Sequence, residues 1–173
     1  MLTPAWKNIF HTAHVPQHVS DWLKRTGSLT HALEAASGAS CMVAVQQEDW
    51  VRVWPEEAQA CPELLDSNWV REVVLTARQP AIFARTVFPR TLLEHAPALR
   101  QLGNTALGNV LFALPRCERL AIEVAEITAE HSLWQRAPKN FLPTTAWARR
   151  SVLQSSLGNF LINEVFLPYV FTL

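Results

Sequence analysis

The sequence predicts an α+β protein built on one antiparallel sheet of about six strands, with helices packed on one side of the sheet. The first observation behind this prediction is composition: 49% of the 173 residues are hydrophobic and 17% are charged, as in a globular chain rather than a disordered one. The second is a series of segments whose apolar residues alternate with period two, as in β-strands. The third is the shortness of several connections between these segments, which forces consecutive strands to run antiparallel.

The N-terminal part of the chain predicts two helices. Ser20 is the expected N-cap of the first helix and Gly27 its stop, while Ser28 and Gly38 have the same roles in the second. A serine side chain accepts hydrogen bonds from the free amides at a helix start, and glycine adopts the left-handed conformation that ends many helices. Further along, residues 90–103 and 105–114 predict short helices among the strands.

The strands follow in order. Residues 40–55 look like two strands joined around "QQED", and residues 68–89 form the clearest hairpin, with "RQP" as its turn. Residues 117–128, 144–154 and 159–168 supply the remaining strands, and "SSLG" joins the last two as a hairpin. No internal repeat or Gly/Ser linker divides the chain, so we expect one domain over residues 1–173.

Charge and composition exclude several classes of function. Lys and Arg total 15, as do Asp and Glu, so no basic excess favours a nucleic-acid partner. No apolar run reaches the roughly 20 residues that span a bilayer, and the N-terminus lacks the apolar core of a signal peptide. We therefore expect a cytoplasmic protein without a membrane span. We also expect a monomer. Three cysteines, odd in number and widely spaced, predict ordinary thiols rather than disulfides or a zinc site.

Two charged side chains interrupt otherwise apolar strand patterns. In "NFLINEVFLP", Glu164 shares a face with Phe160 and Ile162, and Arg71 lies in the same way in "NWVREVVL". A lone buried charge is costly, so two interpretations stay open. Arg71 and Glu164 pair with each other in the core, or they line a pocket where Arg71 binds a ligand carboxylate by a two-point contact and Glu164 binds a different polar group.

Further arginines have similar settings. Arg85 shares the face of Phe83, and Arg149 and Arg150 point to opposite faces of their strand, so at most one of these two faces inward. Several inward cations would suit a ligand with more than one carboxylate; the alternative is that each arginine lays its stem over apolar surface at a sheet edge. The segment "LGNTALGNVLF" offers backbone amides at a helix start that could receive an anion, without the spacing or the Lys of a P-loop.

No other motif for catalysis or metal binding stands out. His11, His14 and His18 have a helical spacing, but Pro16 interrupts it and no Cys or carboxylate partner is near. We therefore expect no metal site. The sequence also contains no recognisable Ser-His-Asp or Cys-His pairing and no nucleophile elbow.

Five short motifs resemble, in order and spacing, those of the chorismate pyruvate-lyase family. They are "DWLKRTGSLTHAL", "NWVREVVL", "ARTVFPRTLL", "LGNTALGNVLF" and "WARRSVLQ…LGNFLINEVFLP", which together extend over most of the chain. The resemblance implies an enzyme that removes pyruvate from chorismate to give 4-hydroxybenzoate, the first committed step of ubiquinone biosynthesis. It also implies a six-stranded antiparallel sheet carrying helices, and no metal or organic cofactor.

The resemblance also implies roles for particular residues. Arg71 and the backbone amides of Leu29 and Leu107 would hold the carboxylate of the product, and Glu164 its phenolic hydroxyl. Leu29 stands where the family's pattern leads us to expect methionine. Because the resemblance implies a contact through the main chain, this change should affect pocket shape more than chemistry. We expect Arg85 to bind the second carboxylate of the substrate or its ether oxygen.

Two rival functions remain. Ligand-binding domains of some transcription regulators share this fold and bind small metabolites without catalysis. Those domains normally follow a DNA-reading helix-turn-helix domain, for which the roughly twenty residues before "DWLKRTG" are too few. The second rival is an inactive relative that binds the product, 4-hydroxybenzoate, without making it.

Overall fold

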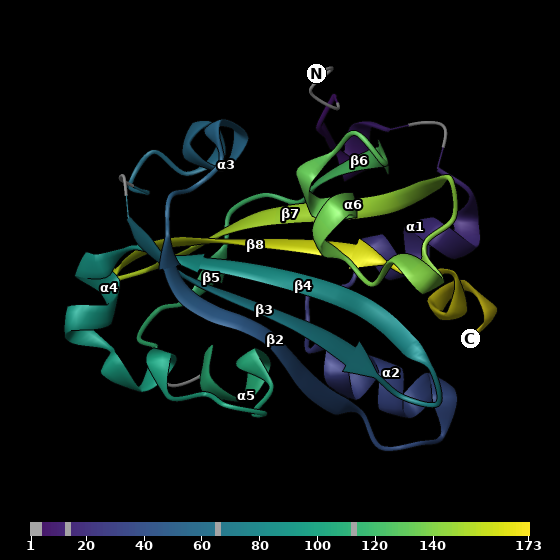
Figure 1. Ribbon diagram of the computed structural model, residues 1–173, viewed down its shortest axis with the longest axis horizontal. Helices are drawn as coiled ribbons and strands as arrows, with labels where there is room; N and C mark the ends of the chain where they lie inside the picture. Colours follow the sequence, from purple (N-terminus) through teal and green to yellow (C-terminus); the bar gives the residue numbers. More distant parts are fainter. Residues whose placement is uncertain (1–4, 13–14, 65–66, 112–113) are drawn as a thin grey trace.

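The chain forms one curved antiparallel sheet with helices on both faces (Figure 1). The computed structural model describes residues 5–12, 15–64, 67–111 and 114–173. Its strands are β1 (Lys7–Asn8), β2 (Met42–Val51), β3 (Asn68–Thr76), β4 (Pro80–Phe88), β5 (Glu118–Arg119), β6 (Glu123–Thr128), β7 (Thr145–Ser155) and β8 (Gly158–Phe166). They pair in the order β1-β6-β7-β8-β4-β3-β2, and β5 pairs with β7 beside this path.

The helices are short and lie before and between the strands. The α-helices are α1 (Gln17–Leu23), α2 (Leu29–Ser37), α3 (Pro55–Ala60), α4 (Arg90–His95), α5 (Leu107–Leu111) and α6 (Ser132–Arg136). Four 3-10 turns complete the described elements: η1 (Ile9–His11), η2 (Pro97–Arg100), η3 (Lys139–Phe141) and η4 (Pro168–Thr172). None of the helices in the described ranges is long and apolar enough to cross a membrane.

The α+β class and the antiparallel sheet are confirmed, with corrections to two details. The sheet has eight strands in the described residues rather than six, because β1 and β5, two residues each, extend the edge of β6 and β7. The helices also occupy both faces. α2 and α5 lie on one side of the sheet and α3 and α6 on the other (Figure 1), because both faces of its central strands are apolar and need cover.

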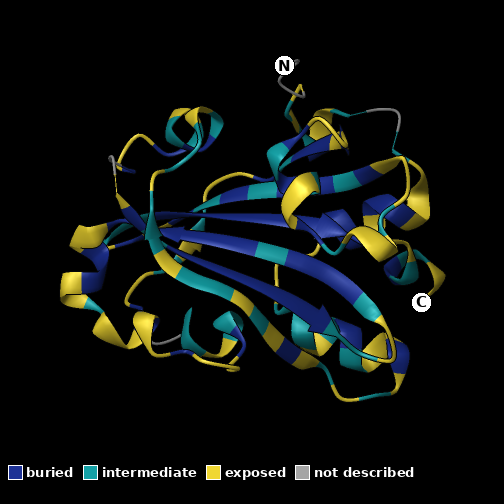
Figure 2. Cartoon of the chain, viewed as in Figure 1, coloured by how far each residue is buried: buried dark blue, intermediate teal, exposed yellow. Residues whose placement is uncertain are grey.

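The three central strands form the core. β3, β4 and β8 are buried along nearly their whole length (Figure 2). On one face, Val73 and Ile82 pack with Leu23 of α1 and Leu33 of α2. On the opposite face, Val74, Phe83 and Val165 pack with Leu133 of α6. The first of these faces carries the cavity described below and is called the cavity face; the second is called the opposite face.

Several local predictions can be scored. The hairpin of residues 68–89 is confirmed as β3 and β4, and Ser28 caps α2 by accepting a hydrogen bond from the His31 amide. Gly38 ends α2 in the left-handed conformation, with φ of +65°. Ser20 is not an N-cap, because α1 begins at Gln17 with Pro16 at the capping position, and Ser20 lies within the helix. Proline fixes a φ suited to the start of a helix. The expected end at Gly27 is also wrong, since α1 ends at Leu23.

Residues 40–55 form one strand where two were expected. β2 runs through "QQED" and changes register between Val45 and Gln47. β2 is an edge strand, where polar side chains can face water without breaking the ladder. The segment after it contains α3, and neither α3 nor α6 was predicted from the sequence. The helices expected at residues 90–103 and 105–114 are present as α4, η2 and α5, although residues 112–113 lie outside the described ranges.

Candidate active site

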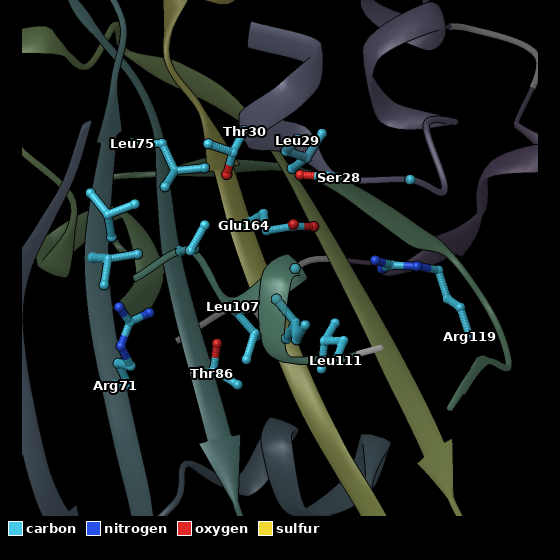
Figure 3. Close-up of a pocket in the computed structure, with 17 residues that line it drawn as sticks. Ser28, Leu29, Thr30, Arg71, Leu75, Thr86, Leu107, Leu111, Arg119 and Glu164 are labelled. Atoms are coloured by element: carbon cyan, nitrogen blue, oxygen red, sulfur yellow. The ribbon is translucent and has the colours of Figure 1, made fainter. Parts of the chain in front are cut away.

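A cavity lies between the cavity face of the sheet and the N-terminal ends of α2 and α5 (Figure 3). Seventeen residues line it. Most are apolar residues or glycines, which suit a flat ring. Those with polar or charged side chains are Ser28, Thr30, Arg71, Thr86, Arg119 and Glu164. The cavity thus presents a small set of polar groups on apolar walls, the usual composition of a small-molecule site.

Arg71 lines the cavity from β3 and is held there by three hydrogen bonds. Its Nε donates to Glu48 on β2 at 3.0 Å, and its Nη2 donates to the carbonyl oxygens of Gly103 and Thr105 at 2.7 and 3.0 Å. Burial lowers the pKa of Arg71, and the charge and hydrogen bond of Glu48 oppose that shift. In this arrangement Nε and both hydrogens of Nη2 have acceptors among the described residues, so the predicted contact to a ligand carboxylate would be made through Nη1.

Glu164 lines the same cavity from β8, two strands away from Arg71. Its Oε2 accepts a 2.5 Å hydrogen bond from Nε of Arg149, its partner across the strand pair β7–β8. Nη1 of Arg149 donates to the carbonyls of Leu23 and Arg25. The interpretation in which Arg71 and Glu164 pair with each other is wrong, because each charge has its own partner. Oε1 of Glu164 receives no hydrogen bond from the described residues, so it is available to a ligand.

The N-termini of α2 and α5 form the roof of the cavity and meet each other. Leu29 is the first residue of α2 and Leu107 the first of α5, and both line the cavity. The first amides of a helix have no partner within it, and a helix start favours negative charge. A Cβ added at Gly108 would lie 3.3 Å from Oγ of Ser28, so glycine at this position allows the two helix starts to approach closely.

Arg85 does not lie at this site, which corrects the role expected for it. Arg71 opposes Thr86 across the hairpin, while Arg85 opposes Glu72 and points to the opposite face. There Arg85 bonds to Glu57 of α3 at 2.8 and 3.1 Å and to Glu72 at 2.8 Å. Its guanidinium also stacks 3.8 Å above the ring of Trp54. This arginine belongs to a buried ionic network and has no access to the cavity.

Arg119 lines the cavity and was missed by the sequence analysis. It lies on β5, opposite Leu153 of β7, and its side chain extends toward Glu164 from the side away from Arg71 (Figure 3). Ile122 and Val124 face the cavity side of the sheet. Strict alternation of side chains from these two residues would place Arg119 on the opposite face. The chain leaves the strand conformation between β5 and β6, however, and this break reverses the alternation.

Of the pair Arg149 and Arg150, only Arg149 faces the cavity side; Arg150 bonds Glu123 on the opposite face.

No cluster of three His, Cys, Asp or Glu side chains that could hold a metal occurs within the described ranges. His14, one of the three spaced histidines, lies outside those ranges. The polar groups of the cavity are instead suited to an anionic organic molecule, with a guanidinium at each end and a carboxylate between them.

Comparison with known proteins identifies the family of this chain. The family model for chorismate lyase matches residues 3–173. This protein belongs to the chorismate lyase family. Among its relatives, a probable chorismate pyruvate-lyase from Pasteurella multocida is 35% identical over 91% of this chain and 86% of its own length. A protein with the same name from Halorhodospira halophila is 35% identical over 84% of this chain and 79% of its own.

Solved structures show a wider distribution of the fold. The effector domain of PhnF from Mycobacterium smegmatis matches 83% of this chain and 90% of its own, with a TM-score of 0.55 and 16% identity. A GntR-family transcriptional regulator from Bacillus cereus matches 75% of this chain and 92% of its own, with a TM-score of 0.52 and 12% identity. At such identities the likeness establishes a common fold and leaves function to the site.

Proposed function

We propose that this protein is a chorismate pyruvate-lyase, which eliminates pyruvate from chorismate to form 4-hydroxybenzoate and so begins ubiquinone biosynthesis. The observation that supports this most directly is the placement of Arg71 and Glu164 on one cavity, with strand β4 between their strands. At about 4.8 Å per strand, the two backbones lie roughly 10 Å apart, which leaves room for one flat ring between the two side chains.

The substrate is held at both ends of its ring in this proposal. Arg71 binds the ring carboxylate through Nη1, and the backbone amides of Leu29 and Leu107 complete the carboxylate site, in keeping with their positions at two helix starts. Oε1 of Glu164 accepts the hydrogen bond of the C4 hydroxyl, while Arg149 balances the charge of the carboxylate. Apolar side chains such as Val73 and Ile162 contact the ring.

The reaction asks for positioning more than for reactive side chains. The bond between C3 and the ether oxygen breaks, C4 loses its hydrogen, and the ring becomes aromatic, which drives the reaction strongly forward. The hydrogen passes to the methylene carbon of the enolpyruvyl group through a cyclic arrangement, or a base removes it. In both cases the protein contributes by holding the reactive conformer and by stabilising negative charge on the departing group.

A direct assay tests the proposal against its rivals. Purified protein is mixed with chorismate, and the appearance of 4-hydroxybenzoate is followed by absorbance while pyruvate is measured with a coupled enzyme. The proposal expects both products in equal amounts. A protein that binds 4-hydroxybenzoate but releases no pyruvate would instead be a binding or sensor domain of the same fold, and the proposal would be rejected.

A further inference from the structure

We infer that Arg119 forms a second anion subsite in the cavity, which binds the carboxylate of the enolpyruvyl side chain of the substrate. This inference rests on the proposed function and assigns a residue to the half of the substrate that leaves. Arg119 lines the cavity on the side of Glu164 away from Arg71 (Figure 3). Its Nη1 is buried without a hydrogen-bond partner in the described residues. A buried guanidinium nitrogen is rarely left without an acceptor.

Other unsatisfied polar atoms lie on strand residues close to Arg119 in the sheet. In the part of the chain that the structure describes, six buried side-chain atoms lack a partner, and three of them belong to Arg119, Arg149 and Ser151. Arg149 and Ser151 share a face of β7, and Arg119 of β5 opposes the next residue on that face, Leu153. Three polar groups on neighbouring strands of one sheet face therefore lack a partner in the described residues. An oxyanion of a ligand would supply an acceptor.

The charges of the cavity point to the same conclusion. Arg71 is paired with Glu48, and Arg149 with Glu164. Arg119 has no ion pair in the described residues. Burial lowers the pKa of its guanidinium, Glu164 opposes that shift, and Arg149 adds to it. Among the described residues that line the cavity, Arg119 is thus the cation without an ion pair, and a second carboxylate on the ligand would supply one.

The shape of the proposed substrate places that carboxylate at the correct end. In chorismate the enolpyruvyl ether is attached at C3, next to the C4 hydroxyl and away from the ring carboxylate. With the ring carboxylate at Arg71 and the hydroxyl at Glu164, the ether side chain extends past Glu164 toward β5 and β7. As the bond to C3 breaks, its electrons form the keto group of pyruvate, the C4 hydrogen moves to the methylene carbon, and the carboxylate stays on Arg119. 4-Hydroxybenzoate lacks this carboxylate, so Arg119 should distinguish substrate from product.

The experiment compares Arg119→Gln with Arg116→Gln, a matched loss of charge at an exposed arginine three positions earlier. Two measurements are made on each protein: kcat/KM for chorismate and the Kd for 4-hydroxybenzoate. Loss of a hydrogen-bonded charge contact should lower kcat/KM of Arg119→Gln by about 10- to 100-fold. Its Kd for 4-hydroxybenzoate should stay within about twofold of the wild-type value. A residue that only supports the fold would weaken both ligands together.

A pair of unreactive ligands gives a second test that does not depend on turnover. Both ligands carry the ring carboxylate. 3-(Carboxymethoxy)-4-hydroxybenzoate has a second carboxylate on its ether side chain, whereas the ether side chain of 3-ethoxy-4-hydroxybenzoate is uncharged. The wild type and Arg116→Gln should prefer the dicarboxylate by about tenfold or more, and Arg119→Gln should lose that preference, with partial recovery in Arg119→Lys. If the wild type converts chorismate and the two variants have the same kcat/KM and the same preference for the dicarboxylate, the role of Arg119 is overturned while the proposed function stands. A wild type that neither converts chorismate nor binds 4-hydroxybenzoate would overturn the proposed function and this inference with it.

Discussion

The two faces of the sheet both bury arginines, and they use them differently. On the opposite face, every guanidinium nitrogen of Arg85 donates a hydrogen bond to a carboxylate. Nε and Nη2 donate to Glu57, and Nη1 donates to Glu72. Arg136 bonds to Glu72 as well, and Asn163 to Glu57. On the cavity face, Arg119 and Arg149 each keep a buried nitrogen without a partner in the described residues.

This difference identifies which buried charges belong to a binding site. A closed network of ion pairs meets its own hydrogen-bonding needs and has nothing to offer a ligand. Buried donors left without acceptors raise the energy of the empty protein and are satisfied when an anion binds. Burial of an arginine alone therefore does not make it a candidate for ligand binding; incomplete pairing beside a cavity does.

The largest effect is expected from breaking the closed network. Arg85→Met leaves Glu57 and Glu72 buried with fewer partners, and removing one member of a buried pair costs about 3–5 kcal/mol of the free energy of unfolding. Because Arg85 does not touch the cavity, kcat/KM of the folded fraction should stay near the wild-type value. Urea unfolding and kinetics measure the two quantities. The double variant Arg85→Met with Glu57→Gln should recover part of the stability, and a large loss of kcat/KM in folded Arg85→Met would contradict the division between the faces.

The next effect falls on the cavity face. Arg71→Gln removes the charge proposed to bind the ring carboxylate, and loss of one partner of a buried charge pair weakens binding by about 2–5 kcal/mol. Both kcat/KM for chorismate and the affinity for 4-hydroxybenzoate should fall, since both ligands carry this carboxylate. Steady-state kinetics and calorimetry check the prediction. Arg71 also bonds to Gly103 and Thr105, so thermal melting must show that the variant is folded; normal kinetics with a lower melting temperature would make Arg71 structural.

Glu164→Gln should give a smaller effect. The amide keeps the shape of the side chain and can still accept a hydrogen bond from Arg149, but it removes the negative charge that is proposed to bind the C4 hydroxyl. Hydrogen bonds to charged groups contribute about 1.5–3 kcal/mol, so we expect kcat/KM to fall by roughly 10- to 100-fold. Glu123→Gln, at an ion pair of the opposite face with Arg150, is the matched control. Turnover equal to that of the control would exclude Glu164 from the mechanism.

The sequence predicted the site where strands are long and regular, and failed where they are not. Arg71 and Glu164 were found because each lies within a nine-residue strand, β3 or β8, so alternation assigns their faces correctly. Arg119 was missed because the chain breaks between β5 and β6. Arg85 was misplaced because the pairing of β3 with β4 shifts between Leu75 and Thr76. A shift of one residue moves every side chain to the other face, and the sequence of the turn did not reveal it.

The fold was predicted to a similar extent. Capping signals identified α2 correctly, since Ser28 and Gly38 act locally. α3 and α6 were not expected. α3 is six residues long and α6 five, too short for a hydrophobic period to stand out. Their place on the opposite face depends on tertiary contacts with the strands, such as the bonds of Glu57 to Arg85 and of Arg136 to Glu72, which no local pattern contains.

The smallest expected effect concerns a hydrogen bond between α3 and the start of α6, on the opposite face. Nδ1 of His131 accepts from the amide of Leu133, so its Nε2 carries the hydrogen that is donated to Glu56 at 3.0 Å. Burial raises the pKa of Glu56, but the hydrogen bond from His131, with the help of Trp6 and Arg150, outweighs this effect, and the pKa is lowered overall.

A lowered pKa of Glu56 in the folded state fixes the sign of the pH dependence. As the pH falls, the carboxylate of Glu56 is protonated in the unfolded chain at a higher pH than in the folded protein. The contribution of Glu56 to the free energy of unfolding is therefore complete above the ordinary pKa of a glutamate. It disappears as the pH falls through the lower, folded value. Glu56→Gln should therefore cost about 0.5–1 kcal/mol at pH 7 and nothing at a pH below both values, as measured by urea unfolding across the acid range. kcat/KM should not change at pH 7. A change in kcat/KM without loss of stability would mean that the opposite face communicates with the cavity, and that the two faces are not independent.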